Sequence, residues 1–162
     1  FDHPEVIEGL QAAYNQDNGT GQIARASAMG IVSASGNIAG WMSRVPRDIT
    51  GKIDLSFPGS PSGGGSDHAS FICSGAPTVG LGSSSWDYFG YTWHTNLDTF
   101  DKIVWDNVQN NATLVAMLAY LASEDERVSR DLRATVVDFR TGEPREWPTC
   151  EDGARTTNER YR

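Results

Sequence analysis

Hydrophobic and polar positions alternate along most of the chain in short apolar runs and longer amphipathic segments. The longest amphipathic segment covers 105–123, where apolar residues recur three and four positions apart and predict a helix with one buried stripe. A second helix is expected over 36–45, because its apolar residues keep a helical spacing and Pro46 closes it. The remaining pattern predicts helices at 4–10 and 67–73 and strands at 12–16, 22–28, 53–57 and 77–81. Alternating strands and helices of this kind indicate the α/β class.

Two segments break this pattern. Residues 58–66 are rich in Gly, Pro and Ser, a composition that lets a backbone approach a ligand closely. A flexible linker is the alternative, but the elements on both sides need each other to fill one core. From 127 onward the chain carries many acids and arginines with few apolar anchors, and 136–139 could add one strand. We therefore expect one domain over 1–126 and a charged, irregular tail over 127–162.

Composition and charge exclude two classes of partner. The chain has 162 residues, a net charge of −8 and a pI near 4.7. Nucleic acid and anionic membrane surfaces attract basic proteins, so neither is expected as a partner. No apolar run reaches the roughly 18 residues that a transmembrane helix needs. The first residues, 1–4, do not read as a signal peptide or a translation start, and they suggest a chain entered partway.

The two cysteines, Cys73 and Cys150, leave two possibilities open. One bridge could attach the tail to the domain. The apolar residues just before Cys73 instead favour a buried thiol there and a separate thiol in the tail. The segments Asn18-Gly19-Thr20 and Asn111-Ala112-Thr113 match the N-glycosylation pattern, a match that is common by chance.

Three short segments carry side chains suited to catalysis or metal binding. Asp17 follows an expected strand, at the sheet edge where α/β proteins bind ligands, and it could hold a metal or cap its own turn. His68 lies at the start of an expected helix, which Ser66 or Asp67 could cap. His94 lies in an aromatic loop and could ligate zinc or simply face solvent. The acid four residues later could orient its imidazole ring.

Taken together, these segments resemble the dizinc exopeptidase family, which includes aminopeptidases, glutamate carboxypeptidases and the related glutaminyl cyclases. The resemblance rests on NQDNGTG, GSDHASFICSGAPTVGL and WHTNLDTFDKI, in this order and before a long C-terminal helix. It covers most of 1–126 and matches the C-terminal half of the family's catalytic domain. It implies part of an α/β/α sandwich with a mixed, mostly parallel sheet, followed by the irregular tail.

The resemblance also implies a role for each matching residue. Asp17 matches the aspartate that ligates one zinc alone, and His94 matches the histidine that ligates the other. A second group of residues matches a loop that shapes the site without binding metal, or positions near the histidine and along the substrate. They are Ser66, Asp67, His68, Tyr91, Thr95 and Asp98.

The other parts of the family's site precede the Asp17 position in the family and have no match here. They are a bridging aspartate, a second histidine, a glutamate ligand and the glutamate that acts as general base. We therefore expect no catalytic residue in this chain. Zinc is a possible cofactor, with two ions bound only if other polypeptide supplies the missing ligands.

Two functions fit this resemblance. The first is a structural or interaction subunit without activity of its own, whose protein partner covers the open sheet and the exposed apolar faces. The second is the C-terminal part of an active dizinc metallopeptidase that cleaves terminal bonds of peptide substrates. For either function, the resemblance implies a periplasmic or secreted protein.

Overall fold

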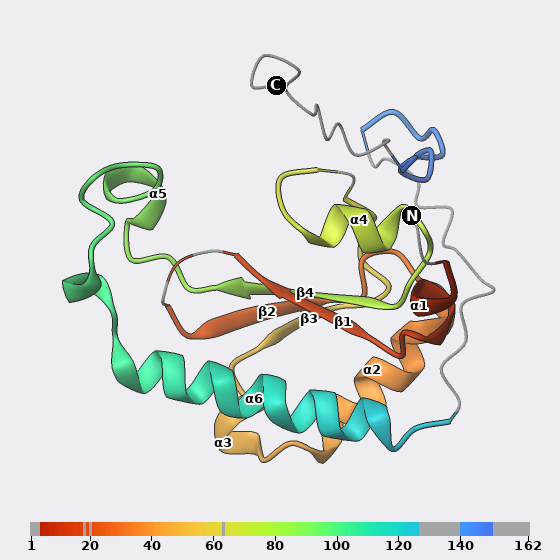
Figure 1. Cartoon of the computed structure of the whole chain (residues 1–162), viewed down its shortest axis with the longest axis horizontal. Coiled ribbons are helices and arrows are strands. Elements are labelled where there is room, and N and C mark those ends of the chain that lie inside the picture. The colour runs from red at the N-terminus through yellow and green to blue at the C-terminus, as the bar shows by residue number, and fades with distance from the viewer. Residues whose placement is uncertain (1–3, 18, 20, 63, 127–139, 151–162) are drawn as a thin grey trace, which may run out of the picture.

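The centre of the molecule is a four-stranded sheet, seen in a computed structural model that describes residues 4–17, 19, 21–62, 64–126 and 140–150 (Figure 1). The strands are β1 (Ala13–Gln16), β2 (Ile23–Ser27), β3 (Asp54–Ser56) and β4 (Thr78–Ser83), in the order β1-β4-β2-β3. β1 pairs with β4, and β2 with β3, in parallel, whereas β2 and β4 run antiparallel. The expected α/β fold with a mixed, mostly parallel sheet is confirmed.

Helices cover the two faces of the sheet unequally. Below the sheet in Figure 1 lie α2 (Val32–Arg44), α3 (Arg47–Thr50) and α6 (Trp105–Ser123). Above it, the short helix α4 (His68–Ile72) contacts β1 and β4. The other elements are α1 (Pro4–Gly9), which precedes β1, and α5 (Tyr88–Tyr91) and the 3-10 turn η1 (Phe100–Lys102), which connect β4 to α6. The second face is thus covered by a described helix only over two of its strands.

The predicted elements are present, but α3, α5 and η1 were not predicted, and two further details differ. All four strands and the long helix are found within two residues of their expected bounds. α2, however, begins at Val32, four residues before the expected start, and Gly36 lies on its exposed side. Neither Ser66 nor Asp67 caps α4: Asp67 makes no capping hydrogen bond, and the hydroxyl of Ser66 bonds to Asn15 instead.

Two predictions cannot be compared with the described residues, and one on membrane spans can. The predicted strand at 136–139 and the glycosylation match at Asn18 lie outside the described residues. None of the described helices combines the length and the apolar character that crossing a membrane requires.

A buried amide holds the long helix against the sheet. Asn111 of α6 is 5% exposed, and its Oδ1 accepts a hydrogen bond from the backbone N–H of Ile23 at 2.9 Å. Its Nδ2 donates to the carbonyl of Gly21, also at 2.9 Å. These bonds tie the start of β2 to the middle of α6. The side chain of Asn111 is therefore buried, with both its oxygen and its nitrogen hydrogen-bonded inside the fold.

A carboxylate joins the far end of α6 to its neighbours. Asp125, just after the helix, is buried, and its Oδ2 accepts hydrogen bonds from Trp41 Nε1 at 3.1 Å and Asn37 Nδ2 at 3.0 Å. Gln11 Nε2 donates to the backbone carbonyl of Asp125. One residue therefore connects α2, the end of α6 and the segment that enters β1.

Cys73 and Cys150 form a disulfide, so the expectation of two separate thiols is wrong. Cys73 directly follows α4 and is only partly buried, whereas Ile72 before it is buried. The segment 140–150 returns to this point, and Trp147 Nε1 donates to the carbonyl of Ile72 at 2.9 Å. The chain separation of 77 residues gives no local signal for the pairing.

Replacing Asn111 should destabilise the fold markedly. In Asn111→Ala, the buried N–H of Ile23 and carbonyl of Gly21 lose their partner, and we expect a loss of about 2 to 4 kcal/mol in the free energy of unfolding. Urea denaturation followed by circular dichroism measures this loss. The neighbouring variant Asn110→Ala should stay within about 0.5 kcal/mol, because the contact of Asn110 with Gln22 Nε2 is long, at 3.5 Å. Equal losses in the two variants would contradict this role for Asn111.

A thiol assay and a double serine variant test the disulfide. The denatured protein should show no reactive thiol before reduction and two afterwards, because the chain holds two cysteines. The double variant Cys73→Ser/Cys150→Ser should lose about 2 to 4 kcal/mol of stability, since the bridge restricts the unfolded chain. A thiol assay and urea denaturation provide the measurements. Two free thiols in the unreduced protein would disprove the pairing.

Candidate functional site

The candidate site lies at the edge of the sheet where β1 and β4 end. These strands are parallel neighbours, with Asn15 opposite Gly80, so their carboxyl ends meet at one edge. Asp17 directly follows β1 and is exposed. β4 leads into residues 84–99, the segment that carries α5 and His94. Both loops lie at the left end of the molecule in Figure 1.

Tyr88 of α5 is the meeting point of these two loops. Gly19, in the loop after β1, has a left-handed φ of 71°, and a Cβ added there would lie 3.0 Å from carbons of the Tyr88 ring. Burial first, then the charge of Asp98 and the charge of Asp17, raise the pKa of Tyr88. The negative charges of Asp98 and Asp17 both act on the phenol of Tyr88, so the two loops bring both carboxylates toward this side chain.

His94 lies in a turn with an uncommon backbone conformation. Its φ is 58°, in the left-handed region that residues other than glycine rarely adopt, and its exposed ring stacks on Trp93 with 4.0 Å between ring centroids. Thr95 fixes this turn: its Oγ1 donates to the carbonyl of Thr92 at 2.8 Å and accepts from the N–H of Leu97 at 3.2 Å. Thr95 therefore shapes the backbone around His94.

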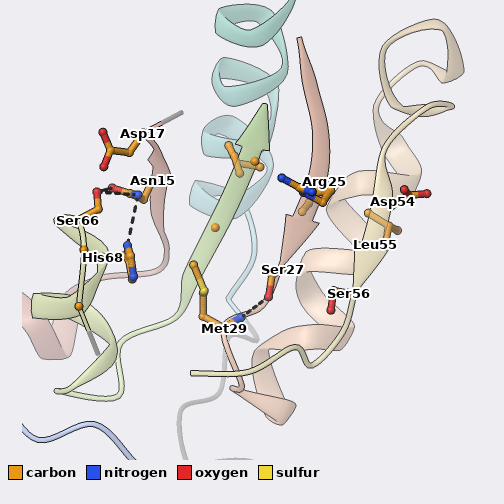
Figure 2. Close-up of a pocket in the computed structure, with 16 residues that line it drawn as sticks. Asn15, Asp17, Arg25, Ser27, Met29, Asp54, Leu55, Ser56, Ser66 and His68 are labelled. Carbon is orange, nitrogen blue, oxygen red and sulfur yellow. Dashed lines mark hydrogen bonds between the residues drawn. The ribbon is translucent and has the colours of Figure 1, made fainter. Parts of the chain in front are cut away.

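A polar cluster lies next to Asp17, between β1 and α4 (Figure 2). Asn15 and Ser66 are joined twice: Asn15 Nδ2 donates to Ser66 Oγ at 3.1 Å, and Ser66 Oγ donates to Asn15 Oδ1 at 3.2 Å. Asn15 Nδ2 also lies 3.4 Å from His68 Nδ1. Because an amide nitrogen can only donate, Nδ1 is the acceptor and a neutral His68 carries its proton on Nε2. Within the described part of the chain, this buried Nε2 has no hydrogen-bond partner.

Asn15 is the member of this cluster that the sequence reasoning missed. The signal was present, because side chains two residues apart in a strand share one face, and Asn15 is two residues before Asp17. The three predicted residues of this loop separate in the structure. Ser66 and His68 join the cluster, whereas Asp67, between them, is exposed. Tyr91 lies at the end of α5, exposed to solvent.

A groove of 440 Å³ extends from this cluster across the open face of the sheet (Figure 2). Gly80 and Gly82 of β4 line it, and a Cβ on Gly80 would collide with the side chain of Met29. Leu55, which is half exposed, also lines this groove. Polar side chains line both sides: Asn15, Ser66 and His68 on one, and Arg25, Ser27, Asp54 and Ser56 on the other. The open face of the sheet therefore combines these polar side chains with apolar ones such as Met29 and Leu55.

The described residues do not complete a metal site. Among them, no group of three or more His, Cys, Asp or Glu side chains is arranged to hold a metal ion. A catalytic zinc usually takes about three protein ligands. Asp17 and His94 therefore do not form a catalytic zinc site by themselves, and no reaction step through a metal follows from this chain alone.

The sequence was compared with known families and structures. Residues 11–119 match the sequence profile of peptidase family M28. The chain belongs to peptidase family M28. The M28 chain is also similar to a solved structure, the peptidase M28 precursor from Shewanella amazonensis SB2B, with a TM-score of 0.67 and 24% sequence identity. This similarity covers 81% of the present chain and 28% of the other. A search of curated proteins found no match.

Family membership confirms the resemblance to zinc exopeptidases and identifies the fold as a partial M28 fold. The M28 chain spans 28% of the length of the solved structure that it matches. The family match runs from just before β1 into α6, so it includes Asp17, His94 and the cluster around Asn15. The disulfide-linked segment 140–150 lies outside the matched residues.

The pKa of Tyr88 tests whether the two loops meet as described. Removing a nearby negative charge makes loss of the phenol proton easier, so Asp98→Asn should lower the pKa of Tyr88, and Asp17→Asn should lower it by less. A pH titration of the tyrosine ¹³Cζ NMR signals measures these shifts. Asp48→Asn, on α3, is the control and should leave the titration unchanged. A Tyr88 pKa that does not respond to Asp17→Asn would place the loop after β1 elsewhere.

Proposed function

We propose that this M28 chain supplies part of the active site of a zinc-dependent exopeptidase, with Asp17 as a ligand of one zinc and His94 as a ligand of the other. The observation that supports the proposal best is the meeting of the loops after β1 and β4 at Tyr88. It brings Asp17 close to the same phenol as Asp98, four residues after His94. The other ligands and the general base would come from polypeptide outside this sequence.

The residues of this chain would have distinct tasks in such a site. Asp17 and His94 offer a carboxylate oxygen and an imidazole nitrogen, both common zinc ligands. Asn15 and Ser66 fix the end of β1 to the loop before α4, and Thr95 holds the turn that carries His94. Bound zinc would polarise the carbonyl of a terminal peptide bond and lower the pKa of a water molecule.

The disulfide supports a location outside the cytoplasm. Disulfides form and persist in oxidising compartments and are rare in the cytosol, where thiols are kept reduced. The Cys73–Cys150 bridge therefore favours a periplasmic or secreted protein. The resemblance to zinc exopeptidases led to the same expectation.

A structural or interaction role is the second candidate. It is favoured by the lack, within the described residues, of a group of three metal-binding side chains. In this role the M28 fold would persist without metal, and a protein partner would cover the exposed apolar side chains.

The zinc content of the native protein that contains this chain separates the two candidates. After purification without chelators, elemental analysis should find about two zinc ions per chain. Asp17→Asn and His94→Ala should each reduce this content and abolish release of terminal residues from unblocked peptides, because each variant loses a ligand. Asp48→Asn, an exposed carboxylate on α3, should retain both the zinc and the activity.

A low zinc content would favour the second candidate. Less than one zinc ion per chain in the native, folded protein would overturn the peptidase proposal. It would favour the interaction role, which purification of the native complex could then test. A chain that always occurs as a free monomer would count against that role too.

A further inference from the structure

Exposed aromatic side chains gather in one segment of the described chain, 89–105. Five of them are between 44% and 73% exposed: Phe89, Tyr91, Trp93, Phe100 and Trp105. We refer to these five side chains as the aromatic surface. The segment runs from α5 through η1 to the start of α6, at one end of the molecule (Figure 1). Aromatic residues are enriched where proteins bind partners, and large exposed apolar patches are uncommon elsewhere.

Four of the five rings of the aromatic surface pack in pairs, and backbone hydrogen bonds hold the turn that carries the first pair. Phe89 meets Trp93 edge to face, with centroids 5.5 Å apart, and Phe100 meets Trp105 in the same way at 5.7 Å. The N–H groups of Thr92 and Trp93 both donate to the carbonyl of Tyr88, which closes the turn after α5. A surface that is ordered before binding loses little conformational entropy when a partner arrives.

Carboxylates outnumber cations around these rings. Residues 86–106 contain one lysine, Lys102, and its ammonium group is paired with Asp101. The other carboxylates of this segment are Asp87, Asp98 and Asp106, and all three are exposed. This charge favours a cationic partner and disfavours nucleic acid or anionic lipid. Arg and Lys groups are also attracted to the faces of Trp and Tyr rings.

The arrangement of the rings indicates the size of the partner. One ring pair, Phe89 and Trp93, belongs to α5 and the turn after it, and the other, Phe100 and Trp105, joins η1 to the start of α6. A small cation can contact one pair, whereas an extended chain with several side chains can use both.

We propose that the aromatic surface, with Asp98 and Asp106, binds a polypeptide segment that combines Arg or Lys with apolar side chains. The apolar side chains contact the rings, and the cationic groups contact the carboxylates and the ring faces. None of these residues is itself a predicted zinc ligand, although the ring of Trp93 stacks on His94, so the binding is tested without metal.

Binding of a short synthetic peptide with alternating Arg and Leu tests the proposal, with a chelator present so that zinc plays no part. Fluorescence anisotropy of the labelled peptide should show saturable binding that weakens as salt is added. Trp105→Ala and Phe100→Ala should each weaken binding about tenfold, because central aromatic side chains provide much of the energy of an interface. The double variant Asp98→Asn/Asp106→Asn should weaken it about three- to tenfold. A peptide of alternating Glu and Leu should not bind.

Matched controls separate this surface from general attraction to an acidic protein. Tyr120→Ala removes an exposed aromatic side chain further along α6, and Asp48→Asn removes an exposed carboxylate on α3; neither should change the affinity. Unchanged affinity in Trp105→Ala and Phe100→Ala, with circular dichroism showing an intact fold, would overturn the proposal. Binding to zwitterionic lipid vesicles in preference to the Arg–Leu peptide would overturn it as well, in favour of a membrane.

Discussion

Parallel pairing between β1 and β4 determines which loops of the molecule can act together. With Asn15 opposite Gly80, both strands end at one edge, and the loops that follow meet at Tyr88 although they are far apart in the sequence. The register also sets the faces. Asn15 points to α4, whereas Tyr14, its neighbour, donates from its hydroxyl to the carbonyl of Leu118 on α6 at 2.9 Å. A shift of one residue would exchange these faces and separate Asn15 from Ser66.

The other end of α4 is held by a disulfide and an indole. α4 has five residues, too few to be stable as an isolated helix, so its position depends on its contacts. Asn15 holds its first residue, and the Cys73–Cys150 bridge and the hydrogen bond from Trp147 hold its end. The ring of Trp147 also lies close to Gly30, where a Cβ would be 3.3 Å from it. The segment 140–150 thus braces α4 and the turn after β2, two walls of the groove, from outside the residues that match the M28 profile.

The sequence predicted what local periodicity controls and missed what distant contacts decide. The helix over 105–123 and the four strands follow from spacing and composition. The start of α2 was placed four residues late, at Gly36, although the first turn of the helix also packs against the core through the buried Ala34. The disulfide and the part played by Asn15 depend on which segments meet across the fold, so neither had a local signal strong enough to decide it. The roles of Asp17 and His94 came from motifs of the family and remain predictions.

Exposed apolar side chains are not confined to the open face of the sheet. A sheet left open by a partial domain would ordinarily expose apolar side chains, and water disfavours such a surface. In this chain the open face carries Met29 and the half-exposed Leu55, together with the polar side chains of Ser27 and Arg25. The segment 89–105, which carries the five rings of the aromatic surface, lies at one end of the molecule, beyond the end of β4 (Figure 1). The hydrophobic effect therefore favours covering that end as well as the open face, and a polypeptide bound there would lie beside the candidate zinc ligands.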